Sequence, residues 1–370
     1  MLLKQEKTAT SFVAKPFTLA LCFLMSFGST RIQAADNALA AGAHNDVMFD
    51  NYSPLASSDE LQRRLLSPLL AQALREHIAA SGQALSEQSI DLAHERFAYY
   101  VPLGEPPAAG YGVLVFVSPW QQATLPRSWF AVLDRHATIL VTAAASGNEE
   151  NVIGRRVPLA LTAYENIARR FRIDPSRAYV GGLSGGSRVT LRIALGYPDI
   201  FRGALLNAGS DHFGTLELPF PPTPLLQRFE QDVRLVYVTG TRDTTNAAID
   251  RASRDSARDF CITNLLELPM RDLGHVLIDA GTLARALSAL EAPVAATAEI
   301  EACRARRAQA MAEQIARVEA LLSRGDSGGA QAELASLDAR FGALALPHSL
   351  DLARRVGQTR EQSAHPAVSR

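Results

Sequence analysis

Apolar residues in the central part of the chain form short continuous runs, and segments with helical spacing separate these runs. Such runs are typical of strands that are buried on both faces of a parallel sheet. The predicted strands are residues 96–101, 112–117, 137–143, 177–180, 201–207, 234–239 and 262–268. The clearest helix between them is 157–171. This alternation predicts an α/β domain over residues 96–297, with a mostly parallel sheet and helices on both faces.

The pattern before residue 96 is less regular. Residues 35–55 are mostly polar, and Ser57 and Glu60 then have the spacing of a capping box. This spacing predicts a helix that begins there and runs to about Ala80. We therefore expect an N-terminal polar segment and helix over residues 35–95.

The first 34 residues have the layout of a secretory signal peptide. Three lysines precede an apolar run at residues 17–27, and a short polar stretch then ends at Ala34. A membrane-spanning helix needs about 20 apolar residues, so the run is too short for an anchor. We expect cleavage after Ala34 and a secreted or periplasmic protein.

From about residue 298 the pattern changes to helices only. One apolar stripe precedes a glycine-rich turn at residues 325–329, and a second stripe follows it. The stripes consist of Ile300, Cys303, Met311, Ile315, Val318 and Leu322, and of Leu334, Leu337 and Phe341. They predict a helical hairpin over residues 298–357 that packs on the main domain, followed by a disordered tail at 358–370. Whether the hairpin binds a protein partner is left open.

Composition and charge narrow the function. The 370 residues are 47% hydrophobic and 20% charged, which is enough for one large core, and the formal net charge is −1. This balance gives no basic footprint for nucleic acid. Removal of a signal peptide leaves Cys261 and Cys303, for which export predicts a disulfide, with two separately buried thiols as the alternative.

The most specific motif is Gly182-Leu183-Ser184-Gly185-Gly186. It lies between a predicted strand and a predicted helix, which is the setting of a nucleophile elbow. Small residues beside the serine avoid clashes in the strained turn. Ser184 is therefore the candidate nucleophile.

A serine nucleophile needs a histidine base, and the histidine needs a carboxylate to orient it. In α/β hydrolases the acid and the histidine follow the serine along the chain, each at the end of a strand. Asp243 and His275 meet this requirement. Asp211, which ends the preceding strand, is the alternative acid.

Two backbone N–H groups must bind the oxyanion that forms during acyl transfer. Gly185, which follows the nucleophile, provides the first. The second is expected from the loop at Ser118-Pro119-Trp120-Gln121. Proline has no N–H, so we assign it to Trp120, with Gln121 as the alternative.

The proline-rich segment at residues 218–224 lies between two predicted strands. It is either a lid over the site or a stiff surface loop.

Residues 172–186 and the later Tyr197-Pro198-Asp199-Ile200-Phe201 resemble exported α/β hydrolases of the polyhydroxybutyrate depolymerase and feruloyl esterase type. The resemblance covers about residues 96–290. It implies a secreted carboxylic ester hydrolase with Ser184, Asp243 and His275 as its triad. The sequence departs from that family at Ser118-Pro119, where those enzymes usually have His-Gly.

We therefore expect a serine esterase that acts on a small or polymeric ester, with no cofactor and no metal. Two alternatives stay open. One is a peptidase of the same fold, and the other is a binding protein on a hydrolase scaffold.

Overall fold

The structure is a computed structural model that describes residues 40–82, 90–293 and 300–364. The expected signal peptide at residues 1–34 lies outside the described residues.

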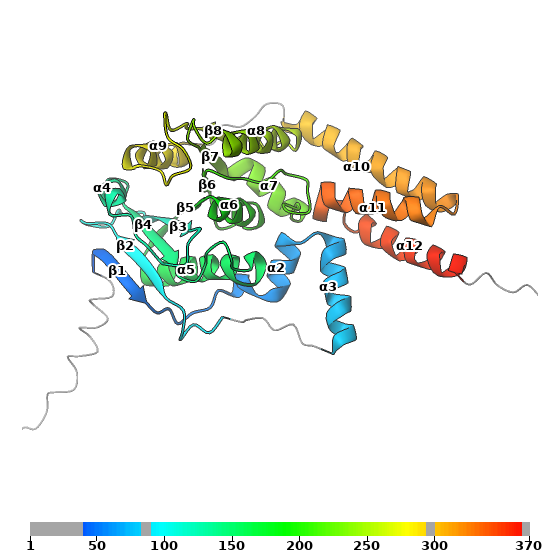
Figure 1. Ribbon diagram of the computed structural model, residues 1–370, viewed down its shortest axis with the longest axis horizontal. Helices are drawn as coiled ribbons and strands as arrows, with labels where there is room; N and C mark the ends of the chain where they lie inside the picture. The colour runs from blue at the N-terminus through cyan, green and yellow to red at the C-terminus, as the bar shows by residue number, and fades with distance from the viewer. Residues whose placement is uncertain (1–39, 83–89, 294–299, 365–370) are drawn as a thin grey trace, which may run out of the picture. The chain divides into compact units, whose positions relative to one another are not determined.

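Within the described residues an eight-stranded sheet forms the centre of the protein (Figure 1). The strands are β1 Gly42–Val47, β2 Phe97–Val101, β3 Tyr111–Val117, β4 Thr138–Ala143, β5 Ile173–Leu183, β6 Gly203–Asn207, β7 Arg234–Val238 and β8 Leu265–Glu267. Their order in the sheet is β1-β2-β4-β3-β5-β6-β7-β8. The pairs β1–β2 and β2–β4 are antiparallel, and the remaining pairs are parallel.

Helices cover both faces of the sheet. The helices are α2 Ser58–Leu65, α3 Pro68–Ser81, α4 Phe130–Arg135, α5 Val157–Arg170, α6 Gly185–Gly196, α7 Thr223–Asp232, α8 Thr244–Asp259, α9 Ala280–Glu291, α10 Ile300–Ser323, α11 Ser327–Phe341 and α12 His348–Ala364. Short helical turns occupy Pro54–Ala56, Arg127–Trp129, Val152–Arg156 and Gly342–Ala345.

Side chains of β3 show how the two faces form. Val113 and Val115 pack in the core that α5 and α6 cover, whereas Leu114 and Phe116 pack in the core that α4 and α9 cover. Strand residues alternate between faces, and a strand buried on both faces must therefore be apolar at every position. The sheet order and its two helical layers make this the α/β-hydrolase fold that the sequence predicts.

The N-terminal region differs from the prediction in two ways. β1 lies in the stretch expected to be an irregular polar segment, and several of its residues are exposed. The expected single helix is two helices, because Pro68 has no N–H to continue the first one. Ser67 then caps α3, just as Ser57 caps α2 by accepting from the Glu60 N–H.

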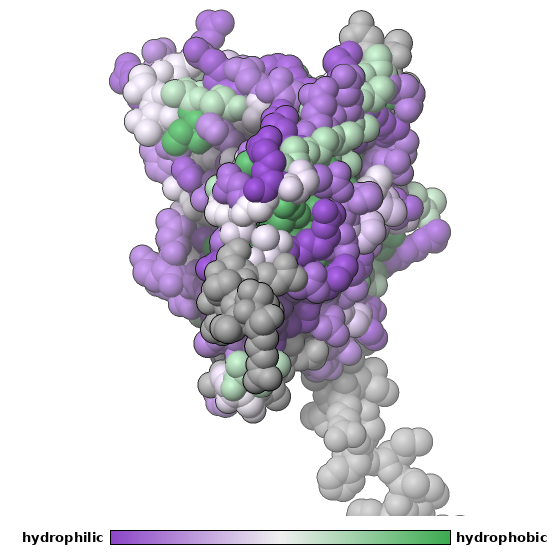
Figure 2. Space-filling view, turned by 90° about the vertical axis from the view of Figure 1, so that its right-hand side faces the viewer, coloured by the Kyte–Doolittle hydropathy of each residue, from purple (hydrophilic) through white to green (hydrophobic). Residues whose placement is uncertain are grey.

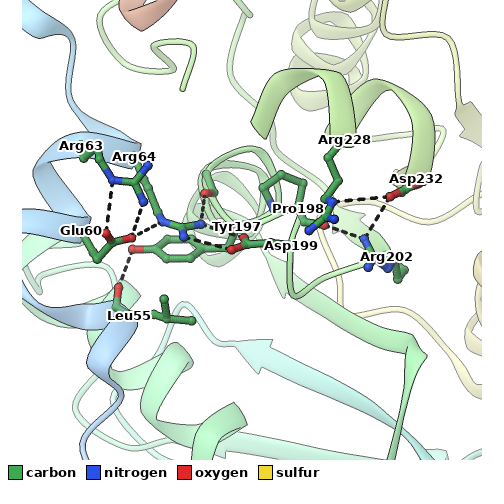
Figure 3. A network of polar contacts seen from close by, with 11 residues as sticks. Leu55, Glu60, Arg63, Arg64, Tyr197, Pro198, Asp199, Arg202, Arg228 and Asp232 are labelled. Carbon is green, nitrogen blue, oxygen red and sulfur yellow. Dashed lines mark hydrogen bonds and ion pairs between the residues drawn. The ribbon is translucent and has the colours of Figure 1, made fainter. Parts of the chain in front are cut away.

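A polar network fastens α2 to the end of α6 (Figure 3). Arg64 donates to both carboxylate oxygens of Asp199 at 2.7 and 3.0 Å and to Glu60 at 2.6 Å. Its guanidinium also lies 4.7 Å from the ring centre of Tyr197, whose hydroxyl donates to the Leu55 carbonyl. The Tyr197-Pro198-Asp199 segment therefore anchors the N-terminal region.

The C-terminal extension contains three helices among the described residues instead of a hairpin and a tail. The third helix, α12, includes residues 358–364, which the sequence analysis assigned to a disordered tail. Leu352 and Val356 lie one turn apart on α12 and are buried, which explains why this segment folds. Residues 365–370 lie outside the described part of the chain.

Covalent and polar contacts join the extension to the hydrolase domain. Cys261 and Cys303 form the expected disulfide, with their Cα atoms 5.7 Å apart. It closes a loop of 42 residues, for which chain entropy gives a stabilisation of up to about 4 kcal/mol. Arg304 and Arg307 of α10 pair with Glu230, whose side chain is fully buried.

The proline-rich segment at 218–224 is neither a lid nor an exposed loop. Leu218 and Phe220 are buried, and the Phe220 carbonyl accepts from the Ala343 N–H at 2.9 Å. Phe220 also packs against Phe260 with tilted rings, 4.5 Å between ring centres. The segment therefore packs between the hydrolase core and the C-terminal helices.

The side of the molecule that carries α3 and the C-terminal helices is mostly hydrophilic, with hydrophobic residues in small separate patches (Figure 2). No helix in the described ranges is both long enough and apolar enough to cross a bilayer.

Candidate active site

Ser184 is the single residue between the end of β5 at Leu183 and the start of α6 at Gly185. Its φ is 57° and its ψ is −123°, a region that residues with a Cβ rarely adopt. A Cβ on Gly182 would collide with the carbonyl of Gly186, and a Cβ on Gly186 would collide with the carbonyl of Val117. The glycines of the motif are therefore required by the packing, and the strained turn has the geometry of a nucleophile elbow.

His275 and Asp243 meet at the carboxyl ends of the strands, as their positions in the chain predict. The Nδ1 atom of His275 lies 2.6 Å from Oδ2 of Asp243. The Asp243 side chain is 8% exposed, whereas that of His275 is 42% exposed. A buried carboxylate thus orients an imidazole that solvent and substrate can reach.

Ser184 and His275 are not hydrogen-bonded in this structure. The Ser184 side chain is partly exposed, and its Oγ makes no hydrogen bond to any described residue. Catalytic hydrogen bonds are often long without substrate and shorten when the substrate binds.

The alternative acid, Asp211, has other partners. Its two carboxylate oxygens pair with Arg188 at 3.1 Å and with Arg192 at 3.3 Å, both on α6. At this edge of the sheet His275 is therefore paired with Asp243 and not with Asp211.

Sequence reasoning missed Asn246, which supports Asp243. Its Nδ2 donates to both carboxylate oxygens of Asp243 at 2.9 and 3.0 Å, and its backbone N–H donates to Oδ1 at 3.3 Å. Burial raises the pKa of Asp243, but the hydrogen bonds from His275 and Asn246 outweigh burial and hold the pKa below its usual value. The signal for Asn246 was its spacing, because Asp243 is the N-cap of α8 and Asn246 is its third residue.

Asn207 was also missed, although it connects three parts of the site. Its backbone carbonyl accepts from the Ser184 N–H at 2.8 Å. Its buried side chain donates to the carbonyls of Val238 and Val276 and accepts from the Ile278 N–H at 2.9 Å. Asn207 therefore binds the elbow through its backbone, and its side-chain amide ties β7 to the loop that carries His275. A polar residue at the end of the apolar strand β6 was the available signal.

The candidate oxyanion donors are backbone N–H groups at the start of α6 and in the loop after β3. Gly185 is the first residue of α6, so its N–H has no partner within the helix, and none elsewhere in the described chain. In the loop after β3, the Ser118 hydroxyl donates to the Trp120 carbonyl at 2.7 Å. The Gln121 nitrogen lies 3.2 Å from where a Cβ of Gly147 would be, so it faces the loop after β4. This leaves the Trp120 N–H as the better candidate for the second donor.

Exposed apolar side chains flank the histidine. Leu273 and Val276 are 37% and 41% exposed on either side of His275. In the described residues, no three His, Cys, Asp or Glu side chains are grouped as metal ligands would be.

A cavity of about 1520 Å³ lies far from this site, at the amino ends of the parallel strands. Its lining includes His136, Arg177, Arg202 and Glu291.

Comparisons with known proteins give one short sequence match and distant structural similarities. No protein-family model matches the sequence. One short stretch is similar to poly(3-hydroxyalkanoate) depolymerase C from Paucimonas lemoignei, with 46% identity over 48 residues. The match spans 13% of this chain and 12% of the depolymerase.

Solved structures with a similar arrangement include S-formylglutathione hydrolase from Staphylococcus aureus and acetyl xylan esterase from Aspergillus awamori. The first is 13% identical and covers 54% of this chain and 93% of its own, with a TM-score of 0.41. The second is 13% identical and covers 53% of this chain and 94% of its own, with a TM-score of 0.41.

Proposed function

We propose that the protein is an exported serine hydrolase that cleaves carboxylic esters through an acyl-enzyme. The observation that carries the proposal is the 2.6 Å contact between His275 and the buried carboxylate of Asp243, at the same sheet edge as the strained Ser184. These three residue types supply the nucleophile, the base and the group that orients the base. Export is proposed from the layout of residues 1–34 and agrees with the Cys261–Cys303 disulfide.

In the first half of the reaction, Nε2 of His275 takes the proton of Ser184 Oγ as the oxygen attacks the ester carbonyl. The N–H groups of Gly185 and Trp120 bind the resulting oxyanion. When the intermediate collapses, the bond to the leaving oxygen breaks and His275 protonates the departing alcohol. The acyl group stays on Ser184.

In the second half, water attacks the acyl-enzyme while His275 takes a proton from it. The new tetrahedral intermediate expels Ser184, which regains its proton from His275, and the carboxylic acid leaves. Asp243 stabilises the imidazolium that forms in each half.

We further propose that the substrate is a small or polymeric ester with an apolar portion. The exposed Leu273 and Val276 beside His275 support an apolar contact, and the stretch similar to a depolymerase favours a polymeric ester.

The test is labelling of the purified full chain with a fluorophosphonate, together with a turnover panel of p-nitrophenyl esters, feruloyl esters, poly(3-hydroxybutyrate) and peptide anilides. We expect labelling of Ser184, which Ser184→Ala abolishes, and turnover of esters. Turnover of peptide anilides that Ser184→Ala abolishes would replace the esterase with a peptidase. No labelling and no turnover would favour a binding protein on this fold.

A further inference from the structure

Two loops at the carboxyl edge of the sheet are joined beside Ser184. The loop after β4, residues 144–151, lies against the loop after β3. The Ala145 N–H donates to the Gln121 carbonyl at 2.7 Å, and the Asn148 N–H donates to the Pro119 carbonyl at 3.1 Å. The backbone position of Asn148 is therefore set by the same loop that holds the candidate oxyanion donor Trp120.

A buried arginine reinforces this junction. Arg156 is 3% exposed and donates to the carbonyls of Ser146 and Ser118 at 2.9 and 3.0 Å. Each of these carbonyls belongs to one of the two loops. The arginine thus fixes their spacing, which is a condition for placing a catalytic group accurately.

The side chain of Asn148 occupies the space in front of Gly185. A Cβ on Gly185 would collide with Oδ1 of Asn148 and would lie 2.9 Å from its Cγ and 3.3 Å from its Nδ2. The carboxamide therefore takes the place of the side chain that Gly185 lacks. It lies beside the Cα of Gly185, the residue that follows Ser184.

This carboxamide is available to a substrate. Asn148 is exposed, and its side chain makes no hydrogen bond within the described ranges. A half-turn of the amide exchanges Oδ1 and Nδ2 within the same plane, so either group can face the reacting carbonyl.

We propose that the side-chain amide of Asn148 donates a hydrogen bond to the oxyanion, as a third donor beside Gly185 and Trp120. The proposal rests on the serine hydrolase function proposed above. Pro119 has no N–H, so Trp120 is left as the backbone donor in the loop after β3. A neutral amide stabilises a developing negative charge without taking part in proton transfer.

The test compares Asn148→Ala and Asn148→Asp with the wild type on a p-nitrophenyl ester. Loss of one oxyanion donor lowers kcat by about 100-fold, and the KM should stay within about twofold, because the bond forms mainly in the transition state. Asn148→Asp should be slower than Asn148→Ala at pH 8, since its carboxylate repels the oxyanion. Glu149→Gln, which changes the neighbouring exposed side chain of the same loop, is the matched control and should retain wild-type kcat.

A boronic acid that forms a tetrahedral adduct with serine gives a second readout. Asn148→Ala should weaken its binding by about the factor by which it lowers kcat, and the thermal unfolding of the variant should match the wild type. A kcat within threefold of the wild type, an effect on KM alone, or an Asn148→Asp variant faster than Asn148→Ala would overturn the proposal while the triad stands. An inactive wild type that no fluorophosphonate labels would overturn both.

Discussion

Two of the histidine–carboxylate pairs among the described residues lie at opposite ends of the parallel strands. His275 lies 2.6 Å from Asp243 at the carboxyl ends, and His136 lies 3.0 Å from Glu291 just before β4, at the amino ends. The second pair lines the cavity of about 1520 Å³. Judged by cavity size and by the presence of such a pair alone, the active site would be placed at the amino ends of the strands. These ends lack the serine elbow.

The two carboxylates differ in what they bind. Glu291 is 28% exposed and also pairs with Arg177 at 2.7 Å, so a permanent cation shares its charge. Asp243 is 8% exposed and binds His275 and the neutral amide of Asn246. Only the pair at the carboxyl ends combines a buried acid, an exposed histidine and a nearby elbow. In α/β sheets this is the edge where ligands generally bind.

Removing each histidine tests this comparison most strongly. His275→Ala and Ser184→Ala should each lower kcat on an ester by about 10⁴- to 10⁶-fold, and the double variant should be little worse, because triad members act as a unit. His136→Ala should keep kcat within about twofold. Steady-state kinetics with one ester measures all four variants, and an inactive His136→Ala that is still folded would reverse the assignment of the two pairs.

Asn207→Ala tests whether the site depends on the amide that joins its parts. The change leaves the carbonyls of Val238 and Val276 and the N–H of Ile278 without this partner, so the free energy of unfolding should fall by about 2–3 kcal/mol. The loop that carries His275 should also loosen, lowering kcat by about 10- to 100-fold.

Asn166→Ala is the matched control for Asn207. Asn166 is also fully buried, and it binds Asn51 and Thr162 away from the site. Urea unfolding should show a similar loss of stability for the two variants, whereas kinetics should show a loss of kcat for Asn207→Ala alone. Equal kcat in both variants would make Asn207 purely structural.

The sequence predicts the sheet and the elbow because both are encoded locally. A strand buried on both faces is apolar along its length, and a nucleophile elbow needs its small residues within five positions. Chain order then identifies Asp243 and His275. The distance between them was not predictable from spacing, because 32 residues separate the two.

Elements at the edges of the molecule were harder to predict. β1 is an edge strand with several exposed residues, so it lacks the apolar run that marks the central strands. α12 has few apolar positions, and its buried Leu352 and Val356 are recognisable only once the partner helices are known. For the same reason, the sequence predicts a lid or a stiff surface loop at 218–224, whereas Phe220 packs beside Phe260.

The missed residues of the site are polar side chains that act between loops. Asn207 and Asn148 bind or touch groups that are distant in sequence, and only the folded sheet brings these groups together. Asn246 differs, because its hydrogen bonds lie within one helix start. Its spacing from Asp243 is therefore readable in the sequence as that of a helix cap.

Asn246→Ala removes the neutral amide that binds Asp243, whereas Glu291 pairs with the cation of Arg177. Loss of its hydrogen bonds should raise the pKa of Asp243 from its lowered folded-state value. A lowered carboxylate pKa adds stability above the unfolded pKa of about 3.9, and this stability is lost as the pH falls through the folded value. The melting temperature of Asn246→Ala should therefore be lower than that of the wild type at pH 7, and the difference should shrink below about pH 4.

The same variant should lower kcat by about tenfold, because Asp243 orients His275 less firmly. Thr282→Val is the control, since Thr282 binds Asp279 at the start of α9 in the same way. It should reproduce part of the pH-dependent loss of stability with normal kcat. A melting difference that stays constant from pH 7 to pH 3 would contradict the role of Asn246 in holding the Asp243 charge.

The smallest effect is expected for Glu291→Gln, at the amino ends of the strands. Glutamine keeps an acceptor for Arg177 and removes the charge that pairs with His136. Partly exposed ion pairs contribute about 0–1 kcal/mol, so the free energy of unfolding should fall by about 1 kcal/mol or less, with kcat unchanged. Urea unfolding and ester kinetics on the same preparation provide both values.

Asp243→Asn, the corresponding change at the carboxyl ends, should instead lower kcat by about 10⁴-fold, because it disturbs the tautomer and charge that the histidine needs. If the two variants lost activity equally, a histidine–carboxylate contact alone would define the site, and the elbow and the burial of Asp243 would not.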